Sequence, residues 1–165
     1  MDFLRNVCGL ASAAVVFAAF APSAVAQDKV ARFVCQNVGS FAPEPLGDRE
    51  GHSISIAQFS CRVVAGPMSG GVMSGMILWE WDKGSAVLVS GDGVVRKPGS
   101  TVVYQDVDGK LALTMTEGKV TGFTASGHVK FPIATGDGAS LAGKSWAWTT
   151  TSTGPDQFEI EDTIE

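Results

Sequence analysis

The sequence predicts an all-β protein: a single small antiparallel barrel of about eight to ten strands, with a β-sandwich as the alternative. Turn-forming residues recur about every eight to twelve positions, and the segments between them are rich in Val, Ile, Thr, Phe and Trp. No helical pattern stands out after residue 26. We favour a barrel because closure removes the exposed edges that antiparallel hairpins otherwise leave.

The start of the chain has the pattern of an export signal. A short polar start precedes an apolar run over residues 7–20, and Ala24-Val25-Ala26 supplies a small-x-small cleavage site. The run is shorter than the roughly 20 apolar residues that a membrane-spanning helix needs. We therefore expect a signal peptide over 1–26 and one domain over 27–165. This places the domain in the periplasm or outside the cell of a bacterium, without stable membrane insertion after cleavage.

Composition narrows the partners and the compartment. After cleavage the chain keeps two cysteines, Cys35 and Cys61, and an even count in an exported protein predicts one disulfide between them. The net charge is −5, and lysine and arginine are not clustered, so we expect no nucleic-acid partner. The oligomeric state stays open.

The expected strands follow from runs of β-forming residues between glycine and proline signals. In 52–64 the apolar positions change phase, which predicts a bulge near Gln58. Breaks are expected at Gly91-Asp92-Gly93 and Ser126-Gly127, and Asp108-Gly109 is the strongest hairpin signal because both residues tolerate the positive φ of a type I′ turn. In chain order the expected strands cover 30–36, 52–64, 73–82, 86–90, 101–107, 110–116, 119–125, 128–133, 145–151 and 157–161.

Residues 51–159 resemble the small β-barrels of the allene oxide cyclase and dirigent class. The features that carry the resemblance are the run of short hairpins, the segment Gly122-Phe123-Thr124-Ala125-Ser126-Gly127 and the glycine-rich loop over 134–143. The resemblance implies a barrel whose interior accepts a small apolar molecule. It implies no activity, because no catalytic position of that class is matched here. Lipocalin-like and avidin-like barrels remain open.

Two Trp-x-Trp pairs are the most distinctive candidates for a binding site. Residues two apart share one face of a strand, so Trp79 lies beside Trp81, and Trp146 beside Trp148. If both pairs point inward, they either fill the core or line a cavity that stacks on a flat or apolar ligand. Tyr104, the single tyrosine, is a further candidate for a polar contact in such a cavity.

Glu80 is the catalytic candidate, and a weak one. It lies between the first tryptophan pair and is expected to face away from the indoles. In the alternative, with the tryptophans outside, Glu80 would enter the interior, where burial raises the pKa of a carboxyl and suits it to general acid or base work.

Metal and nucleotide sites are not expected, and neither is a cofactor. His52 and His128 could join the two cysteines in a zinc site, but the spacing has no close ligand pair. Residues 138–145 match the letters of a phosphate-binding loop, yet a strand follows them where such a loop needs a helix. Asp106-x-Asp108-Gly109 lacks the later ligands of a calcium loop.

The leading interpretation is a non-enzymatic exported barrel that binds a small apolar or aromatic ligand. It depends on the closed architecture, the tryptophan pairs and the lack of a catalytic motif. An isomerase or cyclase that uses one carboxylate, Glu80 first, is an alternative. A structural or interaction module of the cell envelope is the other.

Overall fold

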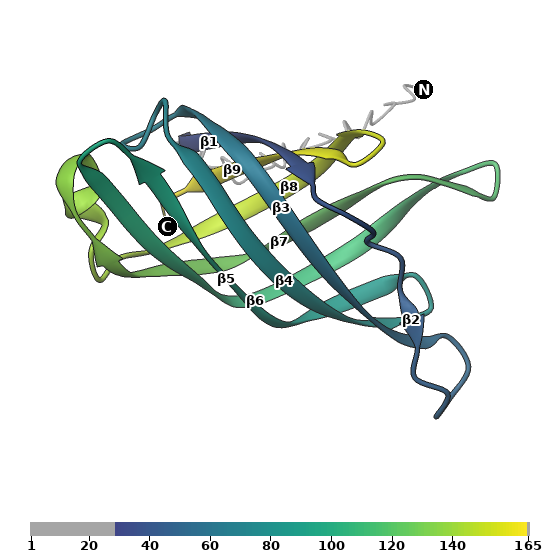
Figure 1. Cartoon of the computed structure of the whole chain (residues 1–165). Helices are drawn as coiled ribbons and strands as arrows, with labels where there is room; N and C mark the ends of the chain where they lie inside the picture. The colour runs from purple at the N-terminus through teal and green to yellow at the C-terminus, as the bar shows by residue number, and fades with distance from the viewer. Residues whose placement is uncertain (1–28, 165) are drawn as a thin grey trace, which may run out of the picture.

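The computed structural model describes residues 29–164, which form one closed antiparallel barrel (Figure 1). Each strand of the wall pairs with the next wall strand in chain order, beginning with β1 and β3, and the pairing of the last strand with β1 closes the ring. The eight wall strands within these residues are β1 (Lys29–Asn37), β3 (His52–Ala65), β4 (Val72–Asp82), β5 (Ser85–Lys97), β6 (Ser100–Thr116), β7 (Lys119–Ala134), β8 (Ser145–Gly154) and β9 (Gln157–Thr163). The predicted all-β barrel is confirmed, while the expected signal peptide lies outside the described residues.

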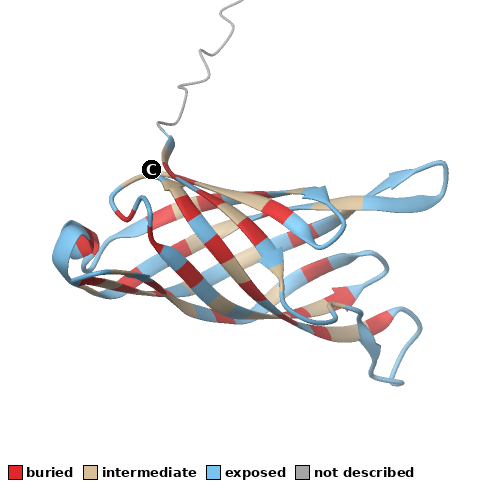
Figure 2. Ribbon diagram, turned by 45° about the horizontal axis from the view of Figure 1, so that its top comes forward, coloured by how far each residue is buried: buried red, intermediate tan, exposed pale blue. Residues whose placement is uncertain are grey.

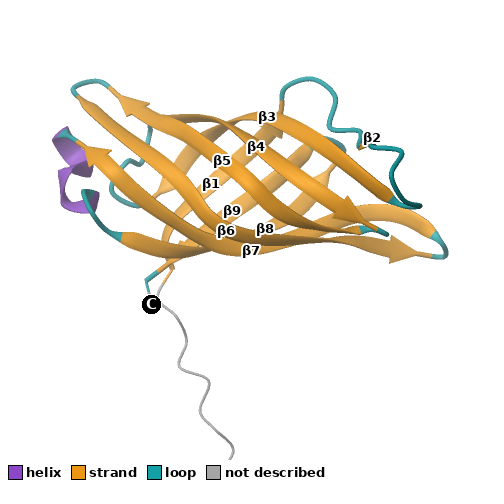
Figure 3. Cartoon of the chain, turned by 90° about the horizontal axis from the view of Figure 1, so that it is seen from below, coloured by secondary structure: helices purple, strands orange, loops and turns teal. Residues whose placement is uncertain are grey.

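Two short elements complete the chain. Strand β2 (Glu44–Pro45) pairs with the start of β3, and the 3₁₀ helix η1 (Gly136–Leu141) lies at the opposite end of the barrel (Figure 3). The sequence predicted a loop over 135–143, and η1 falls inside it. No helix within residues 29–164 is long and apolar enough to cross a membrane.

The interior follows from the two-residue period of the strands. In β4 the side chains of Met73, Ile77, Trp79 and Trp81 point inward, and buried residues alternate with more exposed ones along most of the wall (Figure 2). The apolar face of each strand thus meets the others inside the ring. The core is strongly aromatic, with Phe33, Phe59, Trp79, Trp81, Tyr104, Phe131, Trp146, Trp148 and Phe158 all buried.

Three expected turns are wrong. Strands β5, β6 and β7 run without interruption through Gly91-Asp92-Gly93, Asp108-Gly109 and Ser126-Gly127. None of these glycines has a positive φ, whereas Gly84 and Gly118, at real hairpin tips, have φ of 90° and 77°. The glycines within the strands serve another purpose: they leave space on the inside of the wall.

The expected bulge near Gln58 is also wrong. The register between β3 and β4 is unbroken from His52 to Arg62. The phase of the apolar residues changes because Ile56 faces outward, while Ser55 points inward and accepts a 2.7 Å hydrogen bond from the Trp81 indole N–H.

The predicted disulfide is confirmed, and it joins two paired strands of the barrel. Cys35 of β1 lies directly opposite Cys61 of β3, and the two sulfurs are bonded. The bond therefore links the first two strands of the wall, and we call the β1–β3 pairing the seam. A disulfide is compatible with an oxidising, exported compartment.

The two ends of the barrel differ. At one end, Met68 and Leu141 are buried beneath the loops over 66–71 and 135–144, and they close the interior. At the other end the loop over 38–51 places Phe41 across the opening, 5.9 Å from the ring of Trp81 and 6.3 Å from that of Phe123.

Candidate functional site

A cavity of about 90 Å³ lies inside the barrel. A single water needs only about 10–15 Å³ on this scale, and an engineered cavity of about 150 Å³ accepts benzene. The space therefore suits a small organic molecule or a few waters. Its wall is largely aromatic and aliphatic, with a few polar side chains among them. The polar members are Asn37, Tyr104, Asp106, Thr150 and Asp162, and Trp148 contributes an indole N–H.

Tyr104 lies across a track of glycines. In the register of the sheet, Phe59 of β3 is opposite Gly75 of β4, Gly75 is opposite Gly93 of β5, and Gly93 is opposite Tyr104 of β6. A Cβ atom at Gly75 or Gly93 would overlap the Tyr104 hydroxyl. The two glycines thus let the phenol lie flat over β5 and β4, with its hydroxyl near the ring of Phe59.

A second track holds Trp148. Trp148 of β8 is opposite Gly127 of β7, which is opposite Gly109 of β6. A Cβ atom at Gly109 would lie 3.1 Å from the Trp148 ring and 3.3 Å from that of Trp79. The indole therefore rests on glycine backbone, and Asp162 is its register partner on the other side, in β9.

Two polar atoms on this wall are buried without a partner. The Tyr104 hydroxyl and the Trp148 indole N–H form no hydrogen bond with any residue in the range 29–164, although the two residues are only 4% and 6% exposed. A buried polar group left unpaired costs about 1–3 kcal/mol. Both residues line the cavity, so a molecule inside it is the candidate for the missing partner.

Two carboxyls face the same cavity. Burial raises the pKa of Asp106 to about 7; the charge of Asp92 adds to the rise, and the Trp148 indole opposes it. Burial and repulsion by Asp106 raise the pKa of Asp162 to about 7. The Trp148 N–H lies near Asp106 and lowers the pKa of that carboxyl, but it does not form a hydrogen bond with it.

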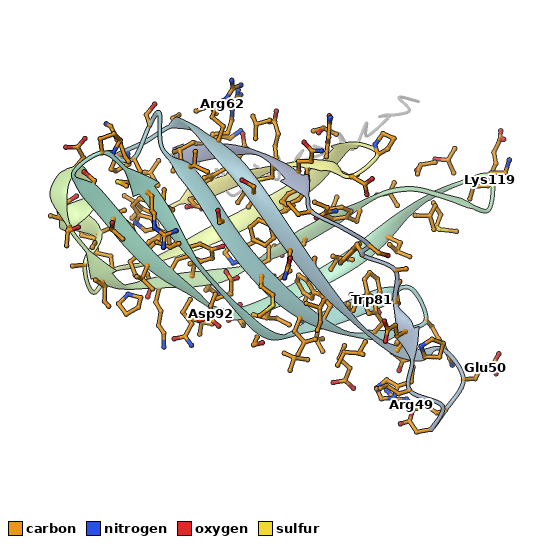
Figure 4. All side chains as sticks on the ribbon, viewed as in Figure 1. Arg49, Glu50, Arg62, Trp81, Asp92 and Lys119 are labelled. Carbon is orange, nitrogen blue, oxygen red and sulfur yellow. A yellow bond between two sulfur atoms is a disulfide. The ribbon has the colours of Figure 1, made fainter. Side chains whose placement is uncertain are left out.

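No Lys, Arg or His in the described part of the chain forms an ion pair with Asp106 or Asp162. Asp92, the other nearby carboxylate, is exposed on the outside of β5 between Gly91 and Gly93 (Figure 4). Burial, followed by these three carboxylates, raises the pKa of the Tyr104 hydroxyl well above its usual value, so the phenol keeps its proton. The two carboxyls in the cavity therefore have no basic side chain as a partner within the residues described.

A bulge in β6 changes which residues of that strand face the interior. The register between β6 and β7 shifts between Asp106 and Asp108. On one side of the shift Tyr104 and Asp106 face inward, and on the other Gly109 and Leu111 do, while Asp108 turns outward and binds His128 at 2.9 Å. Bulges of this kind commonly re-aim side chains near functional sites.

The tryptophan pairs point inward, but their members do different things. Trp79, Trp148 and Tyr104 line the cavity. Trp81 lies at the open end, with its N–H already bonded to Ser55, and Trp146 packs edge-on against Phe131 at 5.0 Å, away from the cavity. One tryptophan of each pair is therefore available to a ligand in the interior.

Glu80 lies outside the barrel, as expected from the inward tryptophans, so its placement in the interior is not observed. Its side chain is 44% exposed and is bonded to the His52 ring at 2.8 Å, and the other ring nitrogen of His52 lies 2.6 Å from Asp48. Hydrogen bonds to these two carboxylates raise the pKa of His52. With Arg49, the cluster anchors the tip of the loop over 38–51 (Figure 4).

The sequence analysis did not identify Asp106 or Asp162 as site residues, although the alternation of the strands contained the signal. Asp162 follows Phe158 and Ile160 at two-residue steps, and Asp106 follows Val102 and Tyr104 in the same way. An acidic residue on an otherwise apolar strand face is the pattern that marks a buried carboxyl.

The structure shows where the residues lie that could have formed a metal or phosphate site. Cys35 and Cys61 are bonded to each other and offer no thiolate. Lys144 and Ser145 lead into strand β8, so the letters of the phosphate-binding loop do not open a helix. No group of three or more His, Cys, Asp or Glu within residues 29–164 is arranged to hold a metal ion.

An open hollow of about 650 Å³ lies beyond the cavity at the open end. Phe41 and Leu113 are on its wall together with Trp81, and Phe41 also lines the inner cavity. Phe41 thus stands between the interior and the solvent.

No protein family, curated protein or solved structure matches the chain.

Proposed function

We propose that the barrel binds a small, largely apolar molecule that carries one hydrogen-bond acceptor. The observation that carries the proposal is the pair of unpartnered donors, the Tyr104 hydroxyl and the Trp148 indole N–H, on the wall of an apolar cavity. A carbonyl oxygen placed between them would satisfy groups that are otherwise buried at a cost. The aromatic wall supplies the apolar contact.

Entry runs past Phe41. This side chain is only partly buried, it comes from the loop over 38–51, and it touches both the inner cavity and the open hollow. Rotation of Phe41 away from Trp81 and Phe123 would join the two spaces. A ligand longer than the cavity would then keep its polar end inside and its apolar tail in the hollow.

Titration of the disulfide-bonded protein with 2-butanone, followed by ligand-observed NMR, tests the proposal. We expect saturable binding that Tyr104→Phe weakens about three- to tenfold, because it removes one hydrogen bond but keeps the ring. Trp148→Phe should weaken binding in the same way. The matched control is Trp146→Phe, on the same strand but away from the cavity, which should leave the affinity unchanged.

Absence of saturable binding at any accessible ketone concentration would contradict the proposal. So would an affinity that the Tyr104 and Trp148 variants change no more than the Trp146 variant does. The resemblance to allene oxide cyclase and dirigent barrels is consistent with a ligand in the interior and stays a prediction.

We place this binding outside the cytoplasm, in the periplasm or the extracellular space. The pattern over residues 1–26 and the disulfide at the seam both support export. Pulse labelling of the chain in a bacterial host would test this: a shortened, oxidised product outside the cytoplasm supports export, and a full-length cytoplasmic product opposes it.

A module that associates through its outer face is a second candidate. Ile56, Met76 and Val89, on neighbouring strands β3, β4 and β5, are 55%, 52% and 51% exposed. Exposed apolar patches are typical of association surfaces. Light scattering would identify this role if the protein forms oligomers that Ile56→Lys disperses, and a monomer at all concentrations would remove the support.

A further inference from the structure

We propose that the barrel is also an acid–base catalyst that moves a proton at the carbon next to the carbonyl of its bound ligand. This inference rests on the proposed function and deepens it by naming the ligand class, enolisable ketones and aldehydes. It stands on the convergence of Asp106, Asp162 and the unpartnered Tyr104 hydroxyl on one small cavity.

The geometry separates the roles of the three groups. Tyr104 is 4% exposed, its hydroxyl has no partner among the residues described, and its proton is firmly held. It is therefore a hydrogen-bond donor on the wall of the cavity, beside the backbone of Gly75 and Gly93. Asp162, 5% exposed and next to Trp148 in the sheet, is the more deeply buried carboxyl and the better second donor when protonated.

Asp106 is the better base. Its side chain is only partly buried, unlike that of Asp162, and it lies over Gly91, where the wall has no side chain to cover it. Two carboxyls that repel one another share their protons as a pair. Because burial raises the pKa of each to about 7, the pair holds close to one proton at neutral pH, with one acid and one base on the wall of the same cavity.

The step balances without any further reactant. The Asp106 carboxylate takes a proton from the carbon next to the carbonyl, and the electron pair of that C–H bond becomes the C=C bond of an enolate. The carbonyl π pair moves to oxygen, where the Tyr104 O–H and the protonated Asp162 stabilise the charge by hydrogen bonds. Asp106 then returns the proton, either to the same carbon or, in a conjugated substrate, to a more distant one.

Hydrogen exchange of 2-butanone in D₂O tests this step. We expect the disulfide-bonded protein to speed deuterium incorporation next to the carbonyl above the buffer rate and to saturate with ketone. Asp106→Asn should reduce the catalysed rate by about 10²-fold or more. Tyr104→Phe should reduce it by about 10²-fold, as for the loss of one oxyanion donor.

Asp108→Asn is the matched control, because Asp108 is on the same strand but turned outward to His128; it should leave the rate unchanged. Saturable ketone binding without catalysed exchange would overturn this inference and leave the proposed function standing. Neither binding nor exchange would overturn both. Equal loss of exchange in the Asp106 and Asp108 variants would also overturn it, since the effect would then not come from the cavity.

Discussion

The seam and the opposite wall of the barrel are built from different residues for different ends. At the seam, β1 and β3 fill the interior with Phe33, Phe59 and the bonded pair Cys35–Cys61. Across the barrel, on β4 to β7, inward positions are left to glycine, and the space is taken by aromatic rings and carboxyls reaching over from other strands. The covalent bond between strands lies at the seam, and the inward glycines lie on β4 to β7, which we call the glycine wall.

The contrast between the two regions explains how a small barrel can contain a cavity. Barrels of eight strands are just wide enough for their own side chains to fill. A cavity therefore requires that some inward positions carry no side chain. The inward glycines are these positions, and the rings of Tyr104 and Trp148 lie flat against them. The rings therefore form the wall of the cavity and leave its centre empty.

The largest effect is expected at the seam. Replacing both Cys35 and Cys61 by Ala should lower the free energy of unfolding by about 3–4 kcal/mol, from loss of the chain-entropy constraint on a loop of this length. Denaturant unfolding measures this, and ketone affinity in buffer should stay unchanged. A variant of unaltered stability but weakened ketone binding would reverse the roles we assign to the two regions.

A change at the glycine wall should lower ketone binding as well as stability. A Cβ at Gly93 overlaps the Tyr104 hydroxyl and the Ser74 carbonyl oxygen, so Gly93→Ala should cost about 1–3 kcal/mol through overpacking. Because Tyr104 must move, ketone binding should fall more than tenfold. Gly154→Ala is the control, since the nearest atom to its Cβ would be Gln157 Oε1 at 3.7 Å. Equal effects of both variants on binding would count against the wall.

The third effect concerns pH. Asp106 and Asp162 have folded-state pKa values near 7, above the unfolded value near 4. Their contribution to stability is thus fully present below about pH 4 and is lost as the pH rises through 7. Between pH 5 and 8 the protein should lose about 2 kcal/mol more than Asp162→Asn does. Thermal unfolding at the two pH values measures this, and parallel curves would show that Asp162 titrates normally.

Much of this fold could be predicted from the sequence because strand alternation and hairpin residues are local signals. The disulfide and the placement of each Trp-x-Trp pair on one face of a strand followed from such signals, whereas which face points inward stayed open. The glycine wall could not be predicted, because Asp108-Gly109 reads as a turn until Trp148, on another strand, is known to lie over it. The site depends on which strands face each other across the barrel, and the register of eight strands is not a local property of the sequence.

The most direct measurement is a ¹³C NMR titration of the side-chain carboxyls of Asp106 and Asp162 in the folded protein. We expect midpoints near pH 7 for both carboxyls. Midpoints near pH 4 for both carboxyls would contradict it, because the pair would then be solvated and the interior would hold no acid–base site.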